Sequence, residues 1–138
     1  MTDTPPFQIT RDGAVAHLRL SRPEVSNALD MRFWTGLGPV LRGLDAAGDV
    51  RALVLSGEGR NFCAGMDTSV FTGGAIMGTD TAAERQAFHQ AARELQDALS
   101  MLERVRFPVI AAVQGACVGA GLDMIAACDL RLASADAY

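Results

Sequence analysis

A single carboxylate, Asp123, stands within the otherwise apolar stretch GACVGAGLDMIAAC, residues 115–128. A carboxylate in apolar surroundings costs free energy unless it is paired, hydrogen-bonded or neutral. Such surroundings raise the pKa of a carboxyl group, which suits a general base working near neutral pH. Asp123 is therefore a candidate catalytic base. The alternative is a structural aspartate, on the solvent side of a helix or bonded to first-turn amides.

Two turns of small residues, FCAGMD (62–67) and GAGLD (119–123), each follow an apolar segment. Small residues let the backbone approach a ligand, and a helix that starts there presents free N–H groups. Two such turns would aim two N–H groups at one oxygen, which is an oxyanion hole; one donor contributes about 3–4 kcal/mol to a developing oxyanion. The alternative is that both turns only allow tight strand–helix packing. The glycine spacing fits neither a dinucleotide fingerprint nor a phosphate loop.

The elements that must position these turns follow from hydrophobic periodicity. Residues 14–20 alternate as a half-buried strand, on which His17 is expected to face solvent. The apolar runs 51–57 and 109–115 both end in glycine, and we expect each to form a buried strand. A further strand begins within 129–138. Strands that alternate with helical segments in this way indicate an α/β fold.

Three helices are expected between these strands. Apolar residues recur at helical spacing from Trp34 to Leu44, where Pro39 is expected to weaken or kink the helix. The strongest pattern predicts a helix over 82–105, which starts with a capping box formed by Thr81 and Glu84. Residues 119–128 predict a short helix.

Composition indicates one globular domain over residues 1–138, with 49% hydrophobic and 20% charged residues. A net charge of −4 without a basic block argues against a nucleic-acid partner. The chain shows no secretory signal and no apolar stretch of membrane-spanning length. The three cysteines and two histidines match no metal-binding pattern, so no metal is expected. Unpaired buried thiols fit a reducing, cytoplasmic location.

Three segments of the chain resemble the crotonase family, also called the enoyl-CoA hydratase/isomerase family. They are RPEVSNALD, NFCAGMD and FPVIAAVQGACVGAGLDMIAACDLRLASADA. The resemblance covers nearly the whole chain and keeps the motifs in order. It implies a crotonase-like spiral of ββα turns that assembles as homotrimers or hexamers. It also implies a substrate that is an acyl-CoA thioester, with coenzyme A as part of the substrate and with no metal or redox cofactor.

The resemblance also implies roles for individual residues. The backbone N–H groups of Met66 and Ala120 would form the oxyanion hole, although family members usually carry glycine at the latter position. That alanine is acceptable if its φ is negative, because the donor is a backbone group. Two segments would lie along CoA, and the residues concerned are Val25, Ala28, Ala64 and Asp67. Asp67 could equally cap the following turn.

Asp123 stands where hydratases of the family carry glutamate, and aspartate there resembles the dienoyl-CoA isomerase branch. The resemblance thus implies an isomerase of unsaturated fatty acyl-CoA, in which Asp123 is one acid/base residue. A 2-enoyl-CoA hydratase is the alternative enzyme, and a non-catalytic binding or assembly subunit is the alternative of another class. The match stops at Tyr138 in mid-pattern. We therefore expect the N-terminal half of such an enzyme, inactive alone because the family's later acids are absent.

Overall fold

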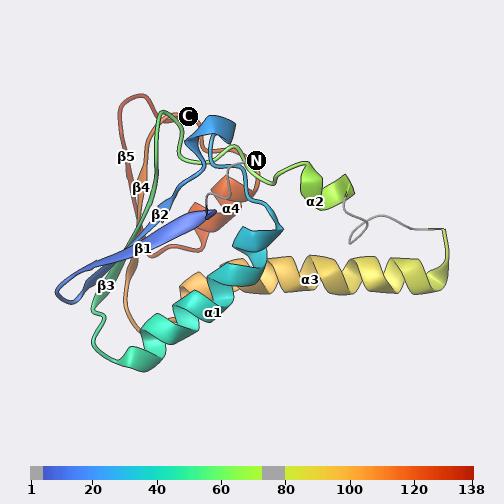
Figure 1. The fold of residues 1–138 in the computed structure, drawn as a ribbon, viewed down its shortest axis with the longest axis horizontal. Helices are drawn as coiled ribbons and strands as arrows, with labels where there is room; N and C mark the ends of the chain where they lie inside the picture. Colours follow the sequence, from blue (N-terminus) through green and yellow to red (C-terminus); the bar gives the residue numbers. More distant parts are fainter. Residues whose placement is uncertain (1–4, 73–79) are drawn as a thin grey trace.

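A five-stranded sheet is the centre of the fold in the computed structural model, which describes residues 5–72 and 80–138 (Figure 1). The strands lie in chain order, β1-β2-β3-β4-β5. The first pair is antiparallel and the other three pairs are parallel. The bounds are β1 (Phe7–Asp12), β2 (Val15–Leu20), β3 (Ala52–Gly57), β4 (Val109–Val113) and β5 (Leu130–Ala133).

Helices fill most of the connections between the parallel strands, as the alternating pattern predicted. Asp30 caps the N-terminus of α1 by accepting a hydrogen bond from the Phe33 N–H group, and Pro39 lies inside this helix without ending it. The helical bounds are η1 (Pro23–Val25, a 3-10 turn), α1 (Met31–Ala47), α2 (Ser69–Thr72), α3 (Ala82–Arg104) and α4 (Ala120–Ala126). No helix in the described ranges is long and apolar enough to cross a membrane.

The core lies where α1 and the C-terminal part of α3 meet one face of the sheet. The strands bury every second side chain in it, because alternate residues point to opposite faces. The helices add apolar side chains at spacings of three and four residues. Its fully buried side chains include Leu18, Leu20, Phe33, Leu37, Leu41, Leu53, Leu55 and Leu102.

The opposite face of the sheet is only half-covered by the described residues. Val54 and Ile110 lie side by side on this face, and both stay half-buried. β3 and β4 are buried, as predicted, on the face toward α1 and α3, and their second face stays half-covered because no described element encloses it. His17 lies in the same row as Val54. It is half-buried and its Nε2 lies 2.7 Å from the Ser56 Oγ, so the prediction of a solvated histidine is wrong.

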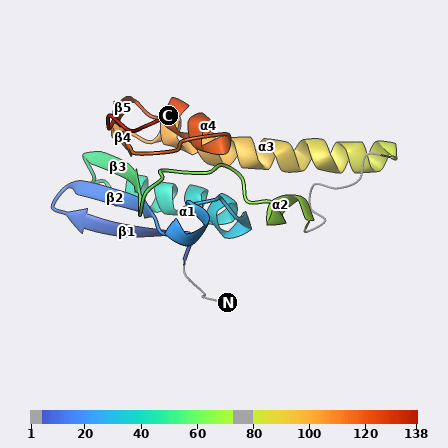
Figure 2. The same ribbon diagram turned by 90° about the horizontal axis from the view of Figure 1, so that it is seen from above.

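The N-terminal part of α3 extends beyond the sheet (Figures 1 and 2). The predicted capping box is confirmed: Thr81 Oγ1 accepts from the Glu84 N–H group, and the Glu84 carboxylate accepts from the Thr81 N–H group. Every side chain over 81–90 is exposed, and the buried residues of α3 begin only at Ala98. Local capping therefore supports this end of the helix in place of packing against described residues.

Candidate functional site

The loops that follow β3 and β4 run side by side, because parallel strands carry their C-terminal ends to the same edge of the sheet. The Cys63 N–H group donates to the Ala116 carbonyl over 3.0 Å, and the Val118 N–H group donates to the Cys63 carbonyl over 3.1 Å. Cys63 and Cys117 form an isolated parallel bridge. The two glycine turns singled out in the sequence are thus direct neighbours.

Two glycines let these turns come into backbone contact. Gly65 has a φ of 92°, and a Cβ placed there would lie 3.1 Å from the Val118 carbonyl oxygen and 3.5 Å from the Ala120 nitrogen. Gly119 has a φ of 54° and packs against the Cα atom of Gly65. A side chain at either position would be strained by the positive φ, and one at Gly65 would also press on the Val118 carbonyl oxygen. The glycines therefore set how close Met66 and Ala120 lie.

The N–H groups of Met66 and Ala120 donate no hydrogen bond to any residue in 5–72 or 80–138. Ala120 is the first residue of α4, and the N–H groups of a first helical turn lack partners within the helix. Its φ is not positive, since Ser26 and Asn27 are the non-glycine residues of the described chain with positive φ. The condition set for an alanine donor is met. Two unpaired N–H groups thus lie on touching backbone segments.

The two segments expected along CoA also lie side by side. The Ala64 N–H group donates to the Ser26 carbonyl over 2.8 Å. Leu29 and Met66 form a parallel bridge. Val25 and Ala64 are exposed and Ala28 is half-buried. The structure therefore brings together four of the sequence-predicted residues, although their contact with CoA stays a prediction.

Asp67 caps the turn that follows it, which is the alternative left open by the sequence. Its Oδ1 accepts from the Ser69 N–H group over 2.9 Å, and its Oδ2 accepts from Arg22 Nη1 over 3.0 Å. The hydrogen bonds from Ser69, with a smaller contribution from Arg22, hold the pKa of Asp67 below its ordinary value. Asp67 is therefore an anion at neutral pH that ties α2 to the loop after β2.

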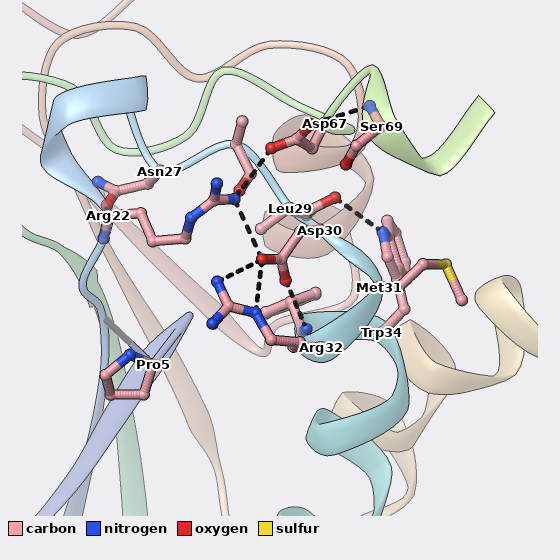
Figure 3. A network of polar contacts seen from close by, with 12 residues as sticks. Pro5, Arg22, Asn27, Leu29, Asp30, Met31, Arg32, Trp34, Asp67 and Ser69 are labelled. Carbon is pink, nitrogen blue, oxygen red and sulfur yellow. Dashed lines mark hydrogen bonds and ion pairs between the residues drawn. The ribbon is translucent and has the colours of Figure 1, made fainter. Parts of the chain in front are cut away.

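Arg22 lies at the centre of a polar network that the sequence analysis missed (Figure 3). Its Nη1 lies between Asp30 and Asp67, at 3.5 Å and 3.0 Å from their Oδ2 atoms. Arg32 pairs with the same oxygen of Asp30 over 2.7 Å. Four charges that sum to zero thus connect η1, α1 and the loop before α2. The only sequence signal was a run of polar residues between β2 and α1, which is typical of a turn.

Asp123 is exposed, so the apolar surroundings expected from its sequence neighbours are absent among the described residues. The helix explains the difference, because Met124 turns into the core while Leu122 and Asp123 turn outward. Asp123 opens on a groove of about 510 Å³ between α3 and α4, lined also by Gln96, Leu99, Ser100, Glu103, Ala126 and Ala127. It lies one helical turn after Ala120, on the helix whose first N–H group is unpaired.

The three cysteines are buried and unpaired, as predicted. Burial raises the pKa of Cys63 to about 11, so this side chain is a neutral thiol at physiological pH. Its sulfur accepts from the Gly65 N–H group over 3.3 Å and lies 3.4 Å from the Asn27 carbonyl oxygen, to which it donates. Cys63 is thus a packing residue beneath the two turns. The described residues contain no cluster of His, Cys, Asp or Glu able to hold a metal ion.

The pattern that defines the enoyl-CoA hydratase/isomerase family matches residues 10–138. The chain belongs to this family. A Delta(3,5)-Delta(2,4)-dienoyl-CoA isomerase, peroxisomal, of Arabidopsis thaliana is 38% identical over 130 residues, which are 92% of this chain and 47% of that protein. The chain thus spans about half the length of this relative.

Solved structures of the enoyl-CoA hydratase/isomerase family agree with the fold. A family member from Marinobacter aquaeolei superposes with a TM-score of 0.85 at 25% identity, covering 96% of this chain and 50% of that one. A Thermobifida fusca structure in complex with acetoacetyl-CoA gives a TM-score of 0.81 at 35% identity, covering 96% and 52%. The predicted α/β, crotonase-like fold and the family assignment are confirmed.

Gly121 provides a test of the close packing between the two glycine turns. A Cβ there would lie 2.9 Å from the Cys63 Cβ, 3.1 Å from its sulfur and 3.2 Å from its carbonyl oxygen. We expect Gly121→Ala to lower the free energy of unfolding by about 1–3 kcal/mol, as overpacking does. The measurement is denaturant unfolding of the chain together with the C-terminal continuation that its relatives have.

Gly43→Ala is the matched control, because Gly43 lies inside α1 and a Cβ there meets nothing within 4 Å. We expect this variant to raise stability by about 0.5–1 kcal/mol through helix propensity. Equal stabilities of the two alanine variants would contradict the packing described at Gly121.

Proposed function

We propose that this chain is the N-terminal part of an acyl-CoA isomerase that converts a 3,5-dienoyl-CoA to a 2,4-dienoyl-CoA. The observation that carries the proposal is that the N–H groups of Met66 and Ala120, on touching backbone segments, donate no hydrogen bond to any described residue. The Arabidopsis relative named as a dienoyl-CoA isomerase supports this branch of the family. The full-length protein in the tests is this chain joined to a C-terminal half like that of its relatives.

The proposed chemistry moves one proton beside a thioester. The thioester oxygen accepts hydrogen bonds from the Met66 and Ala120 N–H groups, which stabilise the negative charge that develops when a proton leaves C2. A proton delivered at C6 then completes the shift of both double bonds. Asp123 is the described carboxylate proposed to exchange one of these protons. The second proton-transfer group is proposed to come from the C-terminal half that the relatives have. The reaction needs no metal or redox cofactor, and coenzyme A is part of the substrate.

The segments 25–28 and 64–67 are proposed to lie along the CoA part of the substrate. They are neighbours in the structure and leave Val25 and Ala64 exposed. The Thermobifida fusca relative was solved with acetoacetyl-CoA, which supports a CoA thioester as the ligand class. Assembly as a homotrimer or hexamer remains a prediction. A cytoplasmic location also remains a prediction, and the Arabidopsis relative is named as a peroxisomal protein.

A 2-enoyl-CoA hydratase is the second candidate, since the Marinobacter aquaeolei neighbour carries the combined name hydratase/isomerase. Both enzymes use the same stabilised anion, and they differ in whether a water molecule is added. A non-catalytic subunit that binds acyl-CoA is the third possibility.

Turnover by the full-length protein separates these possibilities. We expect a 3,5-dienoyl-CoA to give the conjugated 2,4-dienoyl thioester, followed by its ultraviolet absorbance. Hydration of a 2-enoyl-CoA without isomerisation would establish the hydratase instead. Binding of both thioesters without turnover of either would leave a binding subunit.

The Met66 side chain is expected to be dispensable for turnover, because the proposed donor is its backbone N–H group. Met66→Leu should therefore keep kcat of the full-length protein within about three-fold, since a donor that is retained keeps its share of transition-state stabilisation. The measurement is steady-state kinetics beside a circular-dichroism check of folding. A folded variant that loses activity by several orders of magnitude would refute the backbone assignment.

A further inference from the structure

The backbone of Arg22, two residues after the end of β2, is held in place by hydrogen bonds. Its N–H group donates to Asn27 Oδ1 over 2.9 Å, and its carbonyl accepts from the Asn27 N–H group over 2.8 Å. The side chain is 15% exposed. A long side chain that starts from a pinned backbone and is mostly enclosed adopts few conformations, so the guanidinium is held in place.

The guanidinium connects two segments that are far apart in sequence. Its Nη1 donates to the Ala28 carbonyl over 2.7 Å and to Asp67 Oδ2 over 3.0 Å, and it lies 3.5 Å from Asp30 Oδ2 (Figure 3). Planar guanidinium groups suit several fixed acceptors at once, which an ammonium group does less well. Arg22 therefore works as a strap across both segments.

The backbone between these contacts carries the proposed oxyanion donor. The Leu29 N–H group donates to the Gly65 carbonyl over 2.8 Å, and the Asp67 N–H group donates to the Leu29 carbonyl over 3.0 Å. Met66 stands between these two hydrogen bonds, so its peptide plane depends on the Leu29 pairing. Arg22 contacts the residues on either side of Leu29 and the residue after Met66.

The negative charge of Asp67 depends on Arg22 for its pairing more than the charge of Asp30 does. The Asp67 and Asp30 side chains are 18% and 12% exposed, and carboxylates this enclosed need paired charges. Asp30 keeps a second cation, Arg32, at 2.7 Å. Without Arg22, Asp67 would retain only neutral donors among its described partners. It would then turn toward solvent and carry the adjoining Met66 peptide with it.

We propose that Arg22 is a positioning residue that keeps the Met66 N–H group directed at the thioester oxygen. This inference rests on the proposed oxyanion role of Met66 and Ala120. Arg22 acts through the Leu29–Met66 bridge and does not itself touch the reacting atoms. Its loss therefore weakens stabilisation of the transition state more than it weakens binding of the CoA thioester.

The test compares Arg22→Met with wild-type full-length protein. We expect kcat to fall about 10- to 100-fold, less than or equal to the loss of one whole donor, while the Kd of a thioester changes less than about three-fold. The carbonyl stretching band of a bound, isotope-labelled acyl-CoA should move toward its position in free solution. A purely structural role would leave that band in place.

Asp67→Asn keeps the test decisive if Arg22→Met fails to fold. Asparagine retains an oxygen that accepts from the Ser69 N–H group but loses the charge that pairs with Arg22. We expect a smaller fall in kcat and a shift of the carbonyl band in the same direction. In the double variant the losses should not add, because both residues act through one strap.

Arg106→Met is the matched control, since Arg106 pairs with Asp45 over 3.0 Å at the opposite end of the parallel strands. Its kcat should stay within about two-fold of wild type. A raised Kd with unchanged kcat for Arg22→Met would make Arg22 a CoA ligand, and an unchanged band in folded variants would overturn the positioning role. Absence of turnover in the wild-type protein would refute the proposed function but not the positioning role of Arg22. The carbonyl band of a bound thioester would still report whether Arg22 orients the Met66 N–H group.

Discussion

Asp123→Asn is expected to lower kcat of the full-length protein by about 10²–10⁴-fold, the usual contribution of a general base. Asparagine keeps the size of the side chain and removes its ability to take a proton. Because Asp123 is exposed on α4, the substitution leaves no buried polar group unpaired, and folding should be unaffected. Steady-state kinetics with a 3,5-dienoyl-CoA measure the loss, and calorimetric binding of a saturated acyl-CoA measures what remains.

Binding of the saturated thioester should largely survive in Asp123→Asn, because the proposed N–H donors and CoA-binding segments are intact. Asp97→Asn is the matched control, as this acid is exposed on α3 and pairs only weakly with Arg104 across 3.4 Å. It should keep wild-type kcat. Full activity in Asp123→Asn would make Asp123 a structural residue and favour the non-catalytic alternative.

Residues 1–138 expressed alone should be poorly soluble and without isomerase or hydratase activity. Leu130 and Leu132 on β5 are 56% and 66% exposed. Leu130 pairs with Ile110 and so continues the row that Val54 and Ile110 form, and Leu132 lies on the same face beside Ala112. Contiguous apolar surface of this kind promotes association between copies. The chain also supplies one candidate proton-transfer group, whereas a double-bond shift removes a proton at one carbon and delivers it at another.

Size-exclusion chromatography with light scattering, followed by both activity assays, tests the isolated chain. The full-length protein prepared in the same way is the control, and we expect it to be soluble and active. A soluble, cooperatively unfolding and active 138-residue chain would refute the half-enzyme interpretation. The second proton-transfer group would then have to lie within these residues.

Periodic features of the fold were predictable from the sequence because they depend on local patterns. The α3 capping box and the strands β2, β3 and β4 follow from residue spacing within short windows. β1 was not predicted because apolar and polar residues alternate only weakly in its sequence, FQITRD. It is an edge strand with mostly exposed residues, and its pairing with β2 mainly defines it.

The missing parts of the site depend on contacts between distant residues. Arg22 and Asp67 are 45 positions apart, and no local pattern indicates that they meet. The one-sided burial of β3 likewise depends on which elements surround it, since an apolar run alone does not show how many faces are covered. The two glycine turns were predictable as turns, but their contact follows only from the parallel order of β3 and β4.

The parallel bridge between Cys63 and Cys117 also fixes a register for the site. Met66 stands three residues after Cys63, and Ala120 stands three residues after Cys117. The two proposed donors therefore stand at the same number of residues after the two paired cysteines. Side-chain replacements leave this count unchanged. Insertion or deletion of one residue in a single loop would displace one donor relative to the other. The site should therefore tolerate changes of residue type far better than changes of loop length.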